Sequence, residues 1–285
     1  MILDRHNDID DFCVTLKYAY LFAKTVSLCH IHWKDTDEIV QRNRRIGTSM
    51  TGIVQCITRI GEDEFIEWCE RGYKTLERWD FIYSKWFRVS PSVKLTSVKP
   101  SGTVSLLSGS TPGIHAPIST RYVRRITIPD NSPLLPALIN AGYPIVKRKG
   151  QNTSCLAEFP VKLDDCEMKT QREESYIDVL NRAVLLQKHW ADNQVSVTVT
   201  FDPETTSAQD LADALDIYQY SLKGVSFLPS GAIDQYEYPP YEDISEEEYI
   251  ERASVIQPID WNNTVMKDPE KPSYCTNEGC MSVGQ

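Results

Sequence analysis

From about residue 90 onward, segments with strand character alternate with segments of helical periodicity, and this feature limits the possible folds most strongly. Residues 195–201 (VSVTVTF) alternate strictly and are rich in β-branched side chains, which is typical of a strand. The same criteria predict strands over 93–98, 122–128 and 155–161, and helices over 134–141, 176–190 and 208–222. Such alternation predicts an α/β architecture with parallel pairing and ligands near the carboxyl ends of the strands. A barrel and an open sheet both fit, but the strands are too few for a complete barrel.

The first ninety residues have helical periodicity instead. Phe12, Leu16 and Tyr20 recur at three-to-four spacing after Asp8 and Asp10, either of which can cap a helix running to about residue 28. Further helices are predicted over 37–45, 62–86 and, near the end of the chain, 245–253.

Charge and hydropathy exclude several classes of protein. The formal net charge of −10 argues against a protein that mainly grips nucleic-acid backbone, because that function needs a basic surface. The first eight residues (MILDRHND) lack the charged-then-apolar pattern of a signal peptide. The most apolar stretch, residues 12–31, contains Lys17 and Lys24, which a membrane span tolerates poorly. We therefore expect a cytoplasmic chain with neither a membrane nor a nucleic-acid partner.

A turn-forming segment rich in hydroxyl groups, residues 99–105 (KPSGTVS), directly follows the predicted strand over 93–98. Such a loop exposes several backbone N–H groups, and a helix that starts there adds its positive end, so the natural ligand is phosphate or a phosphorylated substrate. A plain turn is the alternative. The segment is not a Walker A loop, because its lysine precedes the loop. His115, which follows Gly113, could contact the same ligand.

Two of the eight cysteines, Cys275 and Cys280, differ from the others because they lie in a tail without periodicity that contains glycine. Structural cysteines usually lie in cores, whereas a pair on a mobile tail suggests a dithiol that exchanges with a buried disulfide and is then reduced again. Zinc binding is a weaker alternative, because the tail supplies no further ligands nearby. An incidental pairing is the third possibility.

Two motifs and their order resemble one family. Residues 42–52 (RNRRIGTSMTG) and 99–107 (KPSGTVSLL), the latter continuing through 112–115 (PGIH) to Arg124-Arg125, resemble signatures of monomeric, adenosylcobalamin-dependent (class II) ribonucleoside-triphosphate reductases. The early helix and the paired tail cysteines follow in the same order as in that family. The resemblance thus covers essentially the whole chain.

The resemblance implies a fold and a substrate site. The fold is the C-terminal portion of a ten-stranded α/β barrel, with a helical N-terminal segment and a flexible C-terminal tail. In the family, the loop that is rich in proline and serine binds the substrate phosphates. That role carries over to Ser101, Gly102, Thr103, Val104 and Ser105.

The resemblance also implies an activity. The family converts ribonucleoside triphosphates to 2'-deoxyribonucleotides by thiyl-radical chemistry, with adenosylcobalamin as the cofactor and thioredoxin as the reductant. Its paired tail cysteines reduce an active-site disulfide and pass the oxidation to thioredoxin. That role carries over to Cys275 and Cys280, and no metal-ligating residues are expected.

The chain departs from the family in one respect. The family's radical cysteine lies in an Asn-x-Cys-x-Glu motif that this sequence does not contain. We expect that motif, the active-site disulfide and the effector regions upstream, on an N-terminal reductase partner. Residues 1–90 are then a helical segment, 91–235 a barrel portion with the phosphate loop, and 236–285 the redox-active tail. The alternatives are a non-catalytic nucleotide-binding remnant, an interaction protein or a small dithiol carrier.

Overall fold

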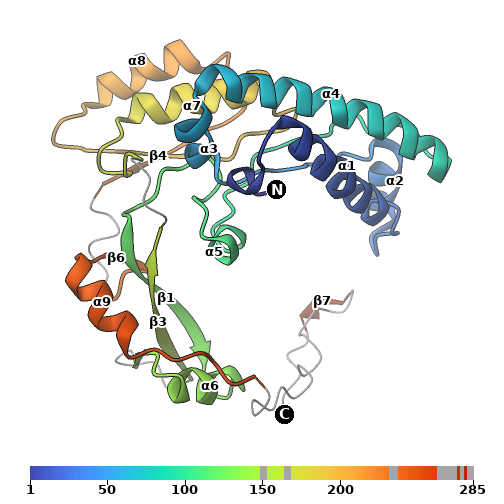
Figure 1. The fold of residues 1–285 in the computed structure, drawn as a ribbon. Helices are drawn as coiled ribbons and strands as arrows, with labels where there is room; N and C mark the ends of the chain where they lie inside the picture. The colour runs from blue at the N-terminus through green and yellow to red at the C-terminus, as the bar shows by residue number, and fades with distance from the viewer. Residues whose placement is uncertain (148–152, 164–167, 231–236, 262–274, 277–278, 281–285) are drawn as a thin grey trace. The chain divides into compact units, whose positions relative to one another are not determined.

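The computed structural model describes residues 1–147, 153–163, 168–230, 237–261, 275–276 and 279–280. Contacts between residues group the chain into two compact units (Figure 1). Unit 1 comprises Met1–Thr120 and Leu163–Gln235, and unit 2 comprises Arg121–Lys162 and Tyr236–Gln285. Within the described residues, no helix is long and apolar enough to cross a membrane. The predicted division into residues 1–90, 91–235 and 236–285 concerns the roles of these segments, and it stays a prediction.

Unit 1 is built mainly from helices. They are a 3-10 helix η1 (Leu3–Arg5), α1 (Ile9–Val26), α2 (Lys34–Asn43), α3 (Ile53–Ile60), α4 (Glu62–Phe87), α5 (Val104–Ser108), α7 (Tyr176–His189) and α8 (Ala208–Tyr218). All five helices predicted in this unit are confirmed, with ends displaced by a few residues. Asp8 caps α1, because its side chain accepts the Asp11 N–H at 2.8 Å. Helix α3 was missed because it is short and has no capping side chain.

Extended segments of unit 1 pair side by side in parallel. Isolated bridges join Ile2 to Thr51, Thr48 to Thr96 and Val98 to Val195, and strand β4 (Thr198–Phe201) pairs with β5 (Ser226–Pro229). The parallel direction predicted for the segments over 93–98 and 195–201 is thus confirmed by the bridge between Val98 and Val195.

The strand predicted over 93–98 is present only as single bridges, and the one predicted over 195–201 is regular only from Thr198. Asn193 explains the interruption, because its backbone N–H and its side-chain Nδ2 donate to the Thr96 carbonyl at 3.0 and 2.7 Å. They occupy a carbonyl that a continuous ladder would use.

The extended segments that pair in parallel form a series with two faces. The alternation along 195–199 places successive side chains on opposite faces of this parallel series. Val195, Val197 and Val199 belong to the main hydrophobic core, which also contains side chains of α1, α4 and α7. Helix α1 lies alongside α4 (Figure 1). Ser196 is half-buried and Thr198 is exposed. The core therefore lies on one face of the series, and the other face is polar.

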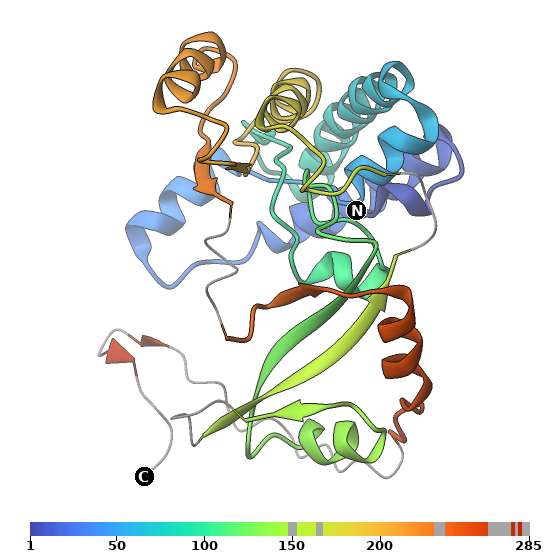
Figure 2. The ribbon, with the colours of Figure 1, turned by 90° about the vertical axis from the view of Figure 1, so that its left-hand side faces the viewer.

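Unit 2 contains an antiparallel sheet and two helices (Figure 2). Its elements are β1 (Arg121–Pro129), α6 (Leu134–Asn140), β2 (Ile145–Val146), β3 (Ser154–Lys162), β6 (Tyr241–Asp243) and α9 (Glu246–Ser254), with the strand order β2-β3-β1-β6. A separate small core contains Ile128, Leu138, Cys155 and Ala157. The predicted strands over 122–128 and 155–161 and the helices over 134–141 and 245–253 are confirmed.

The parallel pairing expected for the strands over 122–128 and 155–161 is wrong. Strands β1 and β3 pair antiparallel, from Arg121 opposite Lys162 to Pro129 opposite Ser154. The segment between them contains β2, which pairs antiparallel with β3 and therefore runs in the same direction as β1. Strand β3 thus reverses direction after β2 and lies between β2 and β1 in the sheet.

The cysteine tail is described only at two short strands. These are β7 (Cys275–Thr276) and β8 (Gly279–Cys280), which pair antiparallel with Cys275 opposite Cys280. The tail was expected to lack regular structure, and residues 262–274 and 281–285 of it lie outside the described residues.

Candidate functional site

The predicted phosphate loop lies between the bridge at Val98 and helix α5. Ser101 has a φ of +57°, in the left-handed region that residues other than glycine seldom adopt. Its carbonyl accepts the N–H of Ser105 at 3.1 Å and the hydroxyl of Ser105 at 2.6 Å. Ser105 is buried, whereas Gly102, Thr103 and Val104 are exposed. The Ser105 hydroxyl thus closes the turn, and residues 102–104 face solvent.

The exposed part of the loop has unused hydrogen-bond donors. Within the described residues, the N–H groups of Gly102 and Thr103 donate to no backbone carbonyl. Lys99, three residues before Gly102, is also exposed, and its own N–H donates to the Ser49 hydroxyl at 2.9 Å. Exposed donors next to a cation can bind an anion.

The base of the loop is held by the other motif that carries the resemblance, residues 42–52. The Thr51 hydroxyl donates to the Thr111 carbonyl at 2.7 Å and accepts the Gly113 N–H at 2.9 Å. Gly113 has a φ of +55°, and a Cβ there would lie 2.6 Å from the Lys99 carbonyl oxygen. The structure therefore brings together two motifs that lie about fifty residues apart in the sequence, and only glycine fits at the contact.

His115 lies at the end of the same loop. Its Nε2 is 3.1 Å from the carbonyl oxygen of Thr198 and 3.2 Å from its nitrogen, at the start of β4. Burial lowers the pKa of His115, so the imidazole is neutral at neutral pH. Its Nε2 is therefore already engaged with β4, and His115 attaches the loop to that strand.

The polar face of the parallel series adjoins the loop, and the sequence reasoning did not assign it a function. Its residues come from three separated segments and, apart from Lys99, are small or hydroxylated: Gly47, Ser49, Ser97, Lys99, Ser196 and Thr198. The alternation in 195–201 was the available signal, since the residues between the buried valines are serine and threonine. That pattern was used to predict a strand and not a polar face.

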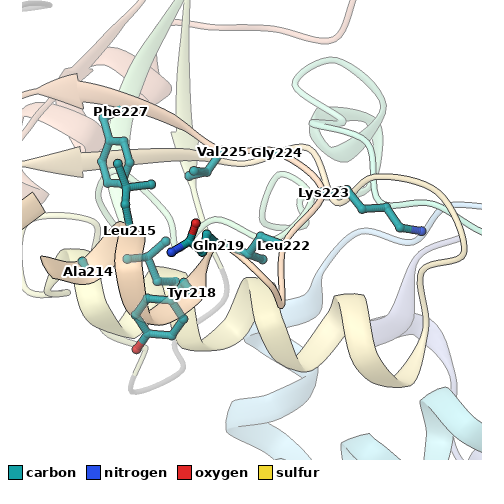
Figure 3. A pocket seen from close by; sticks show the side chains of 10 residues that line it. Ala214, Leu215, Tyr218, Gln219, Leu222, Lys223, Gly224, Val225 and Phe227 are labelled. Carbon is teal, nitrogen blue, oxygen red and sulfur yellow. The ribbon is translucent and has the colours of Figure 1, made fainter. Parts of the chain in front are cut away.

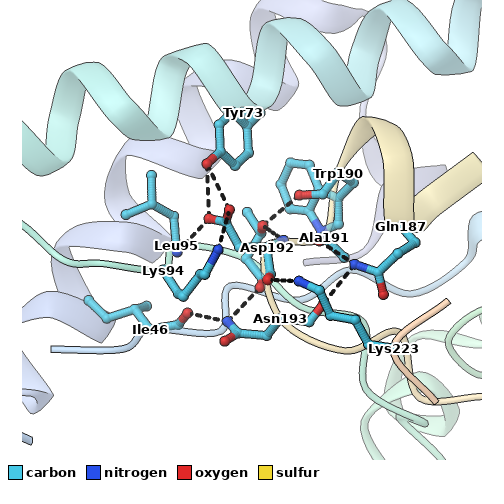
Figure 4. A network of polar contacts seen from close by, with 11 residues as sticks. Ile46, Tyr73, Lys94, Leu95, Gln187, Trp190, Ala191, Asp192, Asn193 and Lys223 are labelled. Carbon is cyan, nitrogen blue, oxygen red and sulfur yellow. Dashed lines mark hydrogen bonds and ion pairs between the residues drawn. The ribbon is translucent and has the colours of Figure 1, made fainter. Parts of the chain in front are cut away.

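A network centred on Asp192 braces the segment that leads to the loop (Figure 4). The Tyr73 hydroxyl donates to the Asp192 carboxylate, with oxygen distances of 3.0 and 2.9 Å, and the Leu95 N–H donates to it at 2.9 Å. Burial and, after it, the bond to Asp192 raise the pKa of Tyr73. Lys223 donates to the Asp192 carbonyl. The donors and acceptors of this network are paired with one another, so the network stabilises the local structure and is not a reaction centre.

The cysteines differ in what they can do. Burial raises the pKa of Cys56 to about 11 and also raises the pKa of Cys69, so both thiols are protonated and unreactive at neutral pH. For Cys275 and Cys280 the backbone pairing places the two residues opposite each other. Within the described residues, no cluster of three His, Cys, Asp or Glu side chains could hold a metal ion.

An apolar pocket of about 150 Å³ lies among α7, α8 and β5, with Tyr218, Leu222 and Phe227 in its lining (Figure 3). Sites that enclose a drug-sized molecule measure about 300–1,000 Å³, and a cobalamin is larger still. This pocket therefore does not fit a corrin cofactor.

Comparisons with known proteins agree with the two motifs. A probable adenosylcobalamin-dependent ribonucleoside-triphosphate reductase of Dictyostelium discoideum is 42% identical over 98% of this chain. The adenosylcobalamin-dependent ribonucleoside-triphosphate reductase of Euglena gracilis is 41% identical over 98% of it. The chain spans 37% and 39% of the lengths of these two relatives, respectively.

The structural comparison points the same way. A crystal structure of a B12-dependent (class II) ribonucleotide reductase matches 86% of this chain, with a TM-score of 0.78 and 30% sequence identity, and the match covers 38% of that structure's chain. No family model matches the chain. On the strength of relatives that are 41–42% identical over nearly its whole length, the chain belongs to the family of adenosylcobalamin-dependent ribonucleoside-triphosphate reductases.

Proposed function

We propose that this chain is the C-terminal part of an adenosylcobalamin-dependent ribonucleotide reductase and contributes the substrate phosphate loop and the tail dithiol. The substrate is a ribonucleoside triphosphate, which the complete enzyme reduces to a 2'-deoxyribonucleotide. The radical cysteine comes from an N-terminal reductase part, because this sequence has no Asn-x-Cys-x-Glu motif. The complete ten-stranded barrel forms only when both parts are present.

The observation that carries the proposal is the loop from Ser101 to Ser105. Its exposed N–H groups at Gly102 and Thr103 and the adjacent Lys99 offer donors and positive charge at one place on a chain of net charge −10. A triphosphate is an anion, so a protein with a net negative charge can bind it only at a site where positive charge and hydrogen-bond donors are concentrated. Ser105 serves the turn itself, since its hydroxyl is bonded to the Ser101 carbonyl.

The polar face beside the loop fits the rest of a nucleotide. Ser49, Ser196 and Thr198 are small and can donate or accept hydrogen bonds to a sugar without excluding it. The core behind them is rigid, so the ligand meets preformed groups.

The tail supplies reducing equivalents. The Cys275 and Cys280 thiols reduce the active-site disulfide of the complete enzyme through a mixed disulfide, giving two thiols there and a Cys275–Cys280 disulfide. Thioredoxin then reduces that disulfide and is oxidised in turn. Pairing of the two residues in opposite positions supports closure of this short loop.

The relatives are named adenosylcobalamin-dependent, and adenosylcobalamin supplies radical chemistry. The pocket of about 150 Å³ among α7, α8 and β5 is too small for the group. We therefore assign cobalamin contacts to none of the described residues and expect the N-terminal part to contribute to that site.

The test is deoxynucleotide formation by this chain co-expressed with the preceding part of a family member, with adenosylcobalamin and either thioredoxin or a small dithiol. We expect turnover only with both parts. A Cys275→Ser/Cys280→Ser variant should lose turnover with thioredoxin and keep it with the small dithiol. Absence of activity in every combination would make this chain a non-catalytic nucleotide-binding remnant.

A glycine substitution tests the phosphate loop separately. A Cβ at Gly102 would meet no protein atom within 4 Å, so Gly102→Ala should leave the stability of the chain unchanged. If phosphate oxygens approach that N–H closely, the variant should raise KM roughly tenfold, since it blocks one charge-assisted hydrogen bond. The matched control is Gly113→Ala, which should distort the loop itself and lower stability. An unchanged KM for Gly102→Ala would exclude the loop as the phosphate site.

A further inference from the structure

We propose that Asp4 and Arg5 are positioning residues for the loop from Ser101 to Ser105, acting through the far end of α5. The inference rests on the proposed phosphate-binding role of that loop. Both residues belong to η1, about one hundred positions earlier in the sequence.

Asp4 begins a chain of hydroxyl groups that leads to the loop. The Ser110 hydroxyl donates to Asp4 Oδ1 at 2.8 Å, and the Ser108 hydroxyl lies 2.9 Å from that of Ser110. Ser108 Oγ is also 3.0 Å from the Ser105 carbonyl oxygen, and the Ser105 hydroxyl donates to the Ser101 carbonyl at 2.6 Å. Ser108 has one hydroxyl proton, so it donates either to Ser110 or to the Ser105 carbonyl. The continuous connection is the Ser110 N–H, which donates to the Ser105 carbonyl at 3.0 Å. Through Ser110 and Ser105, the carboxylate of Asp4 therefore orients the turn at Ser101.

Arg5 makes a second connection to the same end of α5. Its guanidinium donates to the Ser108 carbonyl, and its Nε lies 3.7 Å from Asp4 Oδ2. A cation is favourable beside the last carbonyls of a helix. Asp4 and Arg5 together thus hold both a side chain and a carbonyl of the segment 108–110.

Asp4 is itself held in place by the motif at residues 42–52. The Leu3 N–H donates to the Thr51 carbonyl at 3.0 Å, and Leu3 is fully buried. Gly52 has a φ of +73°, and a Cβ there would lie 2.3 Å from Asp4 Oδ1. Gly52 therefore makes room for the carboxylate, whose side chain is 17% exposed. An anchored and mostly buried carboxylate can define a position, whereas a free surface aspartate cannot.

The consequence is that loop geometry is set before a ligand arrives. Without Asp4, the Ser110 hydroxyl loses its acceptor and the turn at Ser101 samples other arrangements. Ligand binding must then select the productive arrangement, which weakens apparent affinity without changing the reacting groups.

The experiment compares Asp4→Ala, Asp4→Asn, Ser110→Ala and the control Asp63→Asn, an exposed acid in the first turn of α4. In the complete enzyme, Asp4→Ala should raise KM for the triphosphate roughly tenfold, the cost of one hydrogen bond to a charged group, and leave kcat within about twofold. Asp4→Asn keeps an oxygen acceptor for Ser110 and should recover most of this loss. Asp63→Asn should behave as wild type.

Amide hydrogen exchange of residues 101–110 in this chain gives a readout that does not need activity. Asp4→Ala and Ser110→Ala should both increase exchange there and leave exchange in α4 unchanged. Equal exchange and equal KM in Asp4→Ala and wild type would overturn the proposal. Faster exchange in Asp4→Ala together with an unchanged KM for Gly102→Ala would keep the positioning role and reject phosphate binding.

Discussion

Lys24 and Asp80 form a buried ion pair between α1 and α4. The Asp80 carboxylate accepts from Lys24 Nζ at 2.6 Å, from the Tyr20 hydroxyl at 2.7 Å and from the Ser92 N–H at 3.0 Å. Burial lowers the pKa of Lys24, and Asp80 opposes that effect. The Asp80 carboxylate therefore favours the charged form of Lys24, although the Lys24 side chain is fully buried.

Removal of one partner should be costly at this site. Asp80→Asn leaves the ammonium of Lys24 without a counter-charge, and we expect a loss of about 3–5 kcal/mol in the free energy of unfolding. Urea denaturation measures it, with the exposed Glu67→Gln of the same helix as the control. A loss below about 1 kcal/mol would mean that water reaches Lys24.

His115 should make stability depend on pH. Because burial lowers its pKa, the unfolded chain binds a proton at a higher pH than the folded chain does. Stability is therefore lost as the pH falls below about 6.5, the ordinary pKa of histidine, toward the lower folded value. A His115→Gln variant should lack this part of the decrease in the urea midpoint between neutral pH and about pH 5. Equal pH dependence in both proteins would show that His115 titrates normally.

At the scale of elements, the packing of α1 against α4 depends on Gly72 of α4. A Cβ at this position would lie 2.9 Å from Phe12, 3.0 Å from Leu16 and 3.3 Å from Trp190. Gly72→Ala gains about 1 kcal/mol of helix propensity but must displace three core side chains. We expect net destabilisation of about 1 kcal/mol for Ala and more for Val, measured by thermal unfolding. A stabilised Gly72→Ala protein would show that α1 can shift outward.

Local signals predicted those helices whose stability depends on their own periodicity and caps. Helix α1 has a capping aspartate, and α4 is long enough for its apolar face to be evident. The direction of β1 and β3 was predicted wrongly, because it depends on the reversal of the chain after β2 and not on the residues of the two strands themselves. Within the site, the turn-forming composition identified the loop. Asp4 could not be found from the sequence, since its contact with Ser110 spans 106 residues.

At the scale of the whole molecule, the two hydrophobic cores share no residues. The main core lies within unit 1, and the core around Ile128 and Leu138 lies within unit 2. The chain passes from unit 1 to unit 2 after Thr120 and returns at Leu163, whose N–H donates to the Thr120 carbonyl at 2.9 Å. The two passages therefore lie side by side.

This junction predicts that unit 1 can fold without unit 2. A chain ending at residue 235, with a short glycine-serine linker in place of residues 121–162, should unfold cooperatively and retain the buried environment of Trp68 and Trp190. Tryptophan fluorescence and thermal melting measure both properties. A non-cooperative melt with exposed tryptophans would mean that unit 2 is needed for the main core.

The alternation along residues 195–200 has a consequence for tolerance of substitution. Val195, Val197 and Val199 are packed, so a saturation scan should accept only apolar residues of similar volume there. Ser196 is half-buried and Thr198 and Thr200 are exposed, so folding alone should permit many replacements there, while the ligand binding proposed above predicts that activity permits few. A scan scored by protein abundance and a scan scored by growth should then agree at the three valines and disagree at the residues between them. The disagreement would mark, residue by residue, the positions of this strand that serve function and not folding.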